Sequence, residues 1–193
     1  MFTRQRPGNR TSGYPQLRLT ALVACGTRSV IGAVFGPATT GELEYARRLA
    51  VDLQSGMLLL GDRNFASAAL LNQLAATGTD LLVRCKSGRN LPAVGRCRDG
   101  STLTRIGALT VRVINAEITI RTARGISTGH YRLLTTLNDP ATHPATELVR
   151  LYHERWEIET AYAELTSSIL GGHVLRARTP DGIEQEGWAL LTA

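Results

Sequence analysis

Long apolar runs, paired cysteines and lysine are scarce or absent in this sequence of 193 residues. No apolar run approaches the roughly 20 residues that a membrane-spanning helix needs, and no apolar segment of a signal peptide follows the charged N-terminus. The three cysteines, Cys25, Cys85 and Cys97, lack CxxC spacing, which argues against a zinc site and a disulfide framework. We therefore expect a cytoplasmic protein with free thiols and no membrane partner.

Lysine occurs only at Lys86, so arginine makes up the rest of the 22 basic residues. This preference has two explanations of equal weight, codon bias in a GC-rich genome or selection for bidentate phosphate contacts. The formal net charge of +6 and the isoelectric point near 9.8 fit a polyanionic partner, because basic side chains neutralise phosphates and release counterions. Composition alone is thus compatible with nucleic acid binding without establishing it.

The composition, 43% hydrophobic and 20% charged, is typical of one folded domain and excludes a disordered chain. Residues 1–13 are basic and lack apolar periodicity, so we expect a flexible arm followed by one domain over residues 14–193. Periodicity predicts strands and helices in the first part of this domain: strands at Gln16–Ala24 and Val30–Phe35, a helix at Glu42–Leu53, a strand at Met57–Leu60 buried on both faces, a helix at Phe65–Ala76 and a strand at Leu81–Val83.

Residues of about 86–137 break this alternation, because β-branched segments separated by Gly and Asn turns predict a small antiparallel β insertion. Helical spacing then predicts a long helix from about Thr146 to Ile169 and a last helix that contains Trp188. The sequence therefore indicates an α/β domain with a β insertion. The strands predicted for the insertion include Leu109–Ile114, Glu117–Ile120 and Tyr131–Thr136.

The long predicted helix carries one candidate site. At about 100° per residue, Tyr152, Arg155 and Glu159 share a half-buried ledge beside the apolar stripe of the helix. A carboxylate at the margin of a core is costly unless it is paired or coordinates a cation. Glu159 is therefore either a metal ligand or the partner of Arg155 in an i, i+4 ion pair, which is common on helices.

Asp62 is the second candidate, because it follows the apolar strand at Met57–Leu60. Open α/β sheets place ligand-binding and catalytic groups at the carboxyl ends of such strands. The alternative is that Asp62 or Asn64 only caps the helix that begins near Phe65.

These two segments resemble motifs of the DDE transposases. Leu59–Phe65 is similar to the strand-end motif that holds the second acidic residue, and Tyr152–Glu159 is similar to the signature helix of the insertion-sequence-four group. In that signature an Arg follows the Tyr by three residues and a Glu follows the Arg by four. The resemblance runs from about Gly13 to the C-terminus, and it implies a ribonuclease-H-like mixed sheet with flanking helices, a β insertion before the signature helix, and a function in DNA transposition by metal-dependent DNA strand cleavage and transfer.

The resemblance implies that Asp62 and Glu159 are catalytic, metal-binding carboxylates and that Tyr152 and Arg155 contact DNA. Two Mg²⁺ or Mn²⁺ ions about 3.5–4 Å apart would activate the attacking oxygen and stabilise the leaving oxygen. We expect Asp62 and Glu159 to converge on one polar hollow at the carboxyl end of the sheet. The basic residues that we expect to bind DNA phosphates are Arg63, Arg84 and Lys86, with Arg89 as a further candidate.

The sequence departs from the family pattern at two points. Thr166 stands where the signature has a Lys, and no acidic residue precedes Glu42, so the first catalytic Asp and its strand have no candidate. We therefore expect a domain truncated at its N-terminus, and also at its C-terminus after Ala193, that is inactive alone. Two alternatives stay open: a non-catalytic DNA-binding remnant and a decayed gene product. The partners implied are the transposon ends, target DNA and a second copy in a synaptic homodimer, with a nucleoid-associated location.

Overall fold

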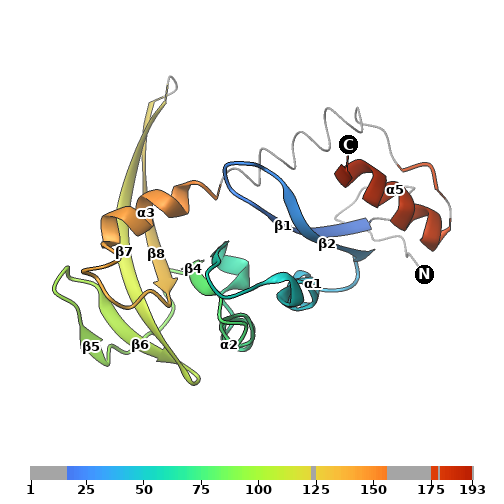
Figure 1. Ribbon diagram of the computed structural model, residues 1–193. Helices are drawn as coiled ribbons and strands as arrows, with labels where there is room; N and C mark the ends of the chain where they lie inside the picture. The colour runs from blue at the N-terminus through green and yellow to red at the C-terminus, as the bar shows by residue number, and fades with distance from the viewer. Residues whose placement is uncertain (1–16, 123–124, 156–174, 178, 193) are drawn as a thin grey trace. The chain divides into compact units, whose positions relative to one another are not determined.

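The computed structural model describes residues 17–122, 125–155, 175–177 and 179–192 (Figure 1). The chain divides into two compact units, residues 1–52 with 156–193 and residues 53–155, and each is described by itself. No helix in these described ranges is long and apolar enough to cross a bilayer. The arm predicted for residues 1–13 lies outside them.

The first unit is built on an antiparallel hairpin of β1 (Leu17–Val23) and β2 (Val30–Pro37), as predicted. The helix α1 (Glu42–Arg48) follows and continues as the 3₁₀ helix η1 (Leu49–Asp52), so the helix predicted for this region is confirmed with a tighter last turn.

Tyr45 of α1 lies directly on β2. A Cβ added at Gly36 would stand 2.1 Å from the Tyr45 hydroxyl oxygen, so only glycine fits beneath this ring. The hydroxyl donates a hydrogen bond to the Pro37 carbonyl oxygen at 2.9 Å.

The last helix, α5 (Pro180–Thr192), belongs to the same unit and confirms the helix predicted around Trp188. The Trp188 ring meets the Phe35 ring of β2 edge to face, with 5.3 Å between the ring centroids. Gly187 permits this approach, since a Cβ there would lie 2.9 Å from the Phe35 ring.

The second unit contains a six-stranded mixed sheet in the order β3-β4-β8-β7-β6-β5. Only β3 and β4 are parallel, and every other neighbouring pair is antiparallel. This architecture confirms the predicted ribonuclease-H-like α/β class with an antiparallel β insertion. The strands are β3 (Leu58–Gly61), β4 (Asp80–Cys85), β5 (Gly95–Arg96), β6 (Thr102–Ile106), β7 (Leu109–Thr122) and β8 (Gly125–Thr135).

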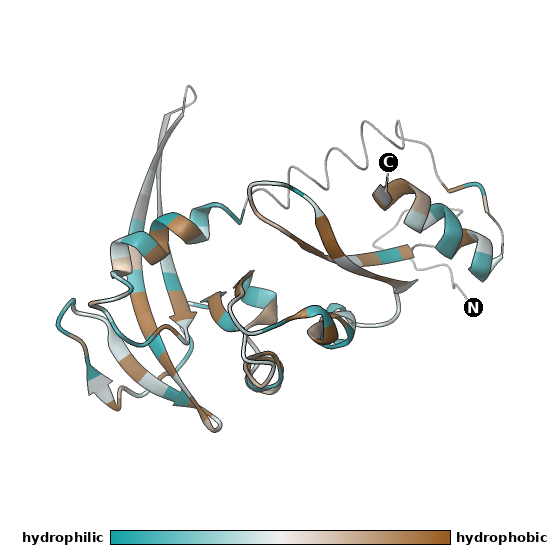
Figure 2. Cartoon of the chain, in the orientation of Figure 1, coloured by the Kyte–Doolittle hydropathy of each residue, from teal (hydrophilic) through white to brown (hydrophobic). Residues whose placement is uncertain are grey.

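Helices cover the sheet of the second unit. α3 (Ala145–His153) is amphipathic, as its alternating hydropathy shows (Figure 2), and its Leu148 and Tyr152 pack in one cluster with sheet residues that include Leu82 and Leu133. α2 (Ala68–Ala75) contacts β4 and β7, and its buried leucines lie outside that cluster. Because side chains alternate across a strand, we place α2 on the opposite face from α3.

The strand β3 is half-buried at Leu58, Leu59 and Leu60, so the prediction of a strand buried on both faces is wrong. The reason is its position: within the described sheet, β3 has β4 on one side only.

The insertion forms a long β ribbon. β7 and β8 pair in one register from Arg112 opposite Thr135 to Thr122 opposite Gly125. β6 pairs with β7 only as far as Val113, and β4 pairs with β8 only as far as Arg132, so the outer part is a two-stranded ribbon that extends beyond the other strands (Figure 1). The two strands predicted at Leu109–Ile114 and Glu117–Ile120 are therefore one strand.

Two predicted helices have different bounds in the structure. The helix predicted from Phe65 begins at Ala68, because Ser67 caps it by accepting a hydrogen bond from the Leu70 amide. α3 ends at His153, where the amide of Glu154 bonds to the Leu151 carbonyl, a tighter turn than an α-helix makes. The remainder of the long predicted helix, from residue 156, lies outside the described residues.

Candidate active site

Asp62 follows β3 directly, at the end where the parallel strands β3 and β4 terminate. Its Oδ1 accepts a hydrogen bond from the Arg63 amide at 2.7 Å and thereby caps the short 3₁₀ helix η2 (Arg63–Phe65). The capping alternative is thus present in the structure. It does not exclude metal binding, because a carboxylate has two oxygens with about four acceptor positions.

Tyr152 links the signature segment to this strand end. Its hydroxyl donates a hydrogen bond to the Gly61 carbonyl oxygen at 3.2 Å, across 91 positions of sequence. The side chain is 4% exposed, so the prediction of a half-buried ledge is wrong for Tyr152. The cause is the packing of α3, which turns Leu148 and Tyr152, one helical turn apart, into the core.

The electrostatics of Tyr152 show which charges lie around its hydroxyl. The pKa of Tyr152 is raised to about 12, mainly by burial and also by the negative charge of Asp62, against the positive charges of Arg155 and Arg84, which lower it. At neutral pH the hydroxyl is therefore protonated and able to donate its hydrogen bond. Three predicted site residues, Asp62, Arg84 and Arg155, thus lie close to Tyr152.

Four side chains form what we call the tyrosine–arginine cluster: Arg84, Tyr131, Tyr152 and Arg155. The Arg84 guanidinium carbon lies 4.2 Å from the centroid of the Tyr131 ring. The centroids of the Tyr131 and Tyr152 rings are 6.4 Å apart, and the two rings meet edge to face. The Arg155 guanidinium lies 5.9 Å from the Tyr152 ring. These contacts fall within the range of cation–π and aromatic pairs.

Strand alternation explains why this cluster and Asp62 lie on the same face of the sheet. Side chains two residues apart share a face, so Arg84 lies on the same face as Leu82, which packs against α3. By the same alternation Asp62 continues the face of Leu60, whose side chain also packs against the α3 cluster. Asp62 and the cluster therefore lie on the α3 face of the sheet.

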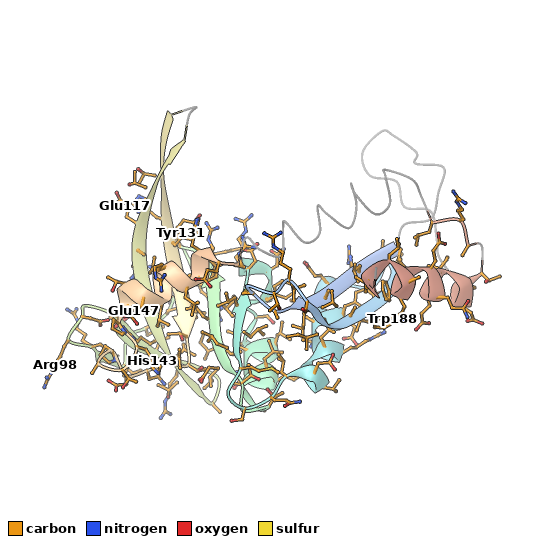
Figure 3. The ribbon with its side chains drawn as sticks, turned by 45° about the horizontal axis from the view of Figure 1, so that its top comes forward. Arg98, Glu117, Tyr131, His143, Glu147 and Trp188 are labelled. Atoms are coloured by element: carbon orange, nitrogen blue, oxygen red, sulfur yellow. The ribbon has the colours of Figure 1, made fainter. Side chains whose placement is uncertain are left out.

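Sequence reasoning missed Tyr131. The residue begins the strand predicted at Tyr131–Thr136, and Figure 3 shows it nearer the body of the sheet than Glu117 on the same ribbon. The sequence could have indicated Tyr131, because side chains two residues apart on a strand share a face, and this places Tyr131 on the same core face as Leu133. The ring is half-buried, with one side against core residues.

The other predicted DNA-binding residues differ in their surroundings. Arg63 and Lys86 are exposed at the ends of β3 and β4. Arg89 instead donates a hydrogen bond to the Ala66 carbonyl oxygen, and its own carbonyl accepts one from Arg132. Arg89 therefore has a structural use in addition to its charge.

Glu159 and Thr166 lie outside the described residues, so the convergence of Asp62 and Glu159 stays a prediction. Within the described ranges, no group of three or more His, Cys, Asp or Glu side chains is placed to bind a metal ion. Asp62 by itself offers the donor chemistry that Mg²⁺ prefers, a partly exposed carboxylate oxygen.

A cavity of about 320 Å³ lies elsewhere in the second unit. Leu58 and Asp80, which begin β3 and β4, line it together with Leu137, His143 and Glu147. It therefore lies at the opposite ends of these strands from Asp62 and is not the predicted polar hollow.

The six-stranded mixed sheet with flanking helices is that of a ribonuclease-H-like domain, and Asp62 stands at the end of its parallel strand pair. The chain belongs to the transposase DDE domain family, whose model matches residues 2–193.

The sequence is also similar to the transposase InsG for insertion sequence element IS4 of Escherichia coli (strain K12). The two are 26% identical over 201 residues, which cover 100% of this chain and 46% of the relative. The chain thus spans about half the length of that protein. This similarity confirms the resemblance to the insertion-sequence-four group.

Proposed function

We propose that this chain forms part of the catalytic domain of a DNA transposase, with Asp62 and Glu159 as ligands of divalent metal ions. The observation that carries this proposal is the hydrogen bond from the Tyr152 hydroxyl to the Gly61 carbonyl. It holds the start of the signature segment against the residue that precedes Asp62. Glu159 follows Tyr152 by seven positions, about two helical turns if that segment is helical.

The metal ions would be Mg²⁺ or Mn²⁺, and when bound they would activate the attacking oxygen and stabilise the leaving oxygen of a phosphodiester. The residues of this chain hold and orient the partners. Asp62 supplies carboxylate oxygens, whereas Arg84 and Arg155 bind DNA phosphates from the tyrosine–arginine cluster. Arg63 and Lys86 extend this basic surface along the strand ends.

Tyr152 has mainly a structural role in this proposal, because it lies in the core under the site. Because its side chain is 4% exposed, its ring reaches DNA only if the side chains around it move. Its protonated hydroxyl fixes the spacing between α3 and the end of β3.

These 193 residues alone are inactive in this proposal. The family pattern needs a first Asp, and no acidic residue precedes Glu42. Thr166 also removes a positive charge that the signature places on the phosphate. The partners we propose are the transposon ends, target DNA and a second copy in a homodimer, with residues 1–13 as a basic arm and residues 86–137 as the insertion.

The first test measures metal binding through the enhancement of water proton relaxation by Mn²⁺. We expect the wild-type chain to bind Mn²⁺ and Asp62→Asn to bind it at least about tenfold more weakly, because one anionic ligand is lost. The control is Asp80→Asn, at the opposite end of the same strand pair. Equal Mn²⁺ affinity of wild type and Asp62→Asn would refute Asp62 as a ligand.

The second test separates this proposal from its alternative, a non-catalytic DNA-binding remnant, which the two arginines of the tyrosine–arginine cluster alone would permit. DNA affinity should fall as salt rises, with a slope of about −0.9 per phosphate neutralised. Salt-dependent DNA binding without Mn²⁺ binding would favour the remnant. Absence of both would leave the decayed gene product as the better account.

A further inference from the structure

The β7–β8 ribbon is joined to the turn at Asp62 on both faces of the sheet. On the α3 face the connection is the tyrosine–arginine cluster, and on the opposite face it is a chain of hydrogen bonds through Arg132 and Arg89. Arg132 of β8 donates from Nε to the Asn115 Oδ1 of β7 at 2.9 Å. Its Nη1 donates to the Arg89 carbonyl oxygen at 3.0 Å. One guanidinium therefore joins both strands of the ribbon to the loop that follows β4.

Arg89 continues this connection. Its Nη1 donates a hydrogen bond to the carbonyl oxygen of Ala66, the residue that ends η2. The same turn is closed from within, since the Phe65 amide bonds to the Asp62 carbonyl at 2.9 Å. The chain of contacts therefore runs from Asn115 through Arg132 and Arg89 to the turn that Asp62 begins.

The two adjacent residues Tyr131 and Arg132 lie on opposite faces of β8. Tyr131 contacts Arg84 and Tyr152 on the α3 face. Arg132 pairs in register with Cys85, whose buried thiol has a pKa raised by burial and lowered by the charges of Arg132 and Arg89. The ribbon base therefore holds the strand ends from both sides of the sheet.

We propose that Arg132 and Arg89 are positioning residues for Asp62. This inference rests on the proposed function, because Asp62 is the carboxylate whose placement matters. A metal-binding carboxylate must be held to within about 0.5 Å of its working position. Hydrogen bonds from a charged guanidinium are roughly twice as strong as neutral ones, so this chain of contacts restrains the turn at Asp62 more firmly than backbone bonds alone.

The test is hydrogen–deuterium exchange of the full chain, read by mass spectrometry. In Arg132→Met we expect peptides covering residues 63–67 and 86–90 to exchange about tenfold faster, as the loss of one hydrogen bond to a charged donor predicts. The peptide covering α3 should be unchanged. Arg105→Met is the matched control, since Arg105 is exposed on β6.

A purely structural role of Arg132 would raise exchange across the whole second unit, α3 included, and this outcome or no change at residues 63–67 would overturn the proposal. Asn115→Ala provides a milder variant, because Asn115 is exposed and its loss frees only the first contact of Arg132. We expect an increase of about threefold at residues 63–67 in that variant.

Mn²⁺ affinity distinguishes a failure of this inference from a failure of the proposed function. With both correct, wild type binds Mn²⁺ and Arg132→Met binds it about tenfold more weakly. Unchanged exchange at residues 63–67 beside normal wild-type Mn²⁺ binding rejects the positioning role alone. No Mn²⁺ binding by wild type rejects the proposed function, and with it the role of Arg132 in placing a metal ligand.

Discussion

Arg112 and Arg84 are both arginines on the α3 face of the same sheet, but they are held in different ways. Arg112 is fully buried and surrounded by acceptors. It pairs with Asp99, donates to the Ser101 hydroxyl at 2.7 Å and donates to the His143 carbonyl oxygen at 2.7 Å. Arg84 is half-buried and held by the face of an aromatic ring.

This difference separates an arginine that organises a core from one that we propose binds DNA. Hydrogen bonds use the N–H edge of the guanidinium, so the donors of Arg112 are engaged within the protein. The cation–π contact of Arg84 with Tyr131 does not itself use its N–H donors, so we expect them to be able to bind a phosphate. Burial and partner type, rather than charge, thus distinguish the two roles.

The largest expected effect comes from removing the enclosed arginine. Arg112→Met should lower the free energy of unfolding by about 3–5 kcal/mol, because it removes the positive charge beside Asp99 and the hydrogen-bond donor of the His143 carbonyl. Urea unfolding followed by circular dichroism measures this change. The exposed control Arg105→Met should stay within about 0.5 kcal/mol of wild type. A loss below about 1 kcal/mol for Arg112→Met would remove the distinction from Arg84.

An intermediate effect is expected in the titration of Tyr152. Absorbance near the tyrosinate band should show an ionisation step at about pH 12 that Tyr152→Phe lacks. Since the folded pKa is raised above the unfolded value of about 10, the contribution of Tyr152 to stability is complete below pH 10 and is lost as pH rises through 12. Titration of every tyrosine near pH 10 would contradict the buried hydroxyl.

The smallest expected effect is that of the stacked arginine on DNA binding. Arg84→Met should weaken DNA binding about threefold to tenfold and reduce the salt slope by about 0.9, while changing stability by less than about 1 kcal/mol. Fluorescence anisotropy with a labelled duplex at several salt concentrations measures both quantities. If Arg84→Met lowered stability but left the salt slope of DNA binding unchanged, Arg84 would have a structural role like that of Arg112.

Much of the fold could be predicted because it is encoded locally. Apolar runs located β3 and β4, and the residues around Trp188 predicted α5. The end of α3 could not be predicted in this way. The predicted apolar stripe runs mainly through residues beyond 155, whereas the buried face of α3 carries Leu148 and Tyr152, so the half-buried position assigned to Tyr152 was wrong.

At the candidate site, Asp62 and Arg155 are predicted because they lie in the two motifs, and Arg84 is predicted only from its charge. In the structure the charges of all three act on the Tyr152 hydroxyl, and their roles in the site stay predictions. Tyr131 and Arg112 were missed because their partners are distant in sequence: Arg112 bonds to His143 across 31 positions. Such contacts depend on strand register, which periodicity does not determine.

The β7–β8 ribbon also has a kinetic consequence. Its strands are joined by residues 123–124 alone, so the ribbon closes with little loss of chain entropy, on the order of microseconds. The Tyr152–Gly61 bond instead closes a loop across 91 positions. We expect the ribbon to be protected first in pulse-labelled refolding and the Asp62 region last, and simultaneous protection would reject this order. Substitutions in the late-forming region would then change the unfolding rate more than the folding rate.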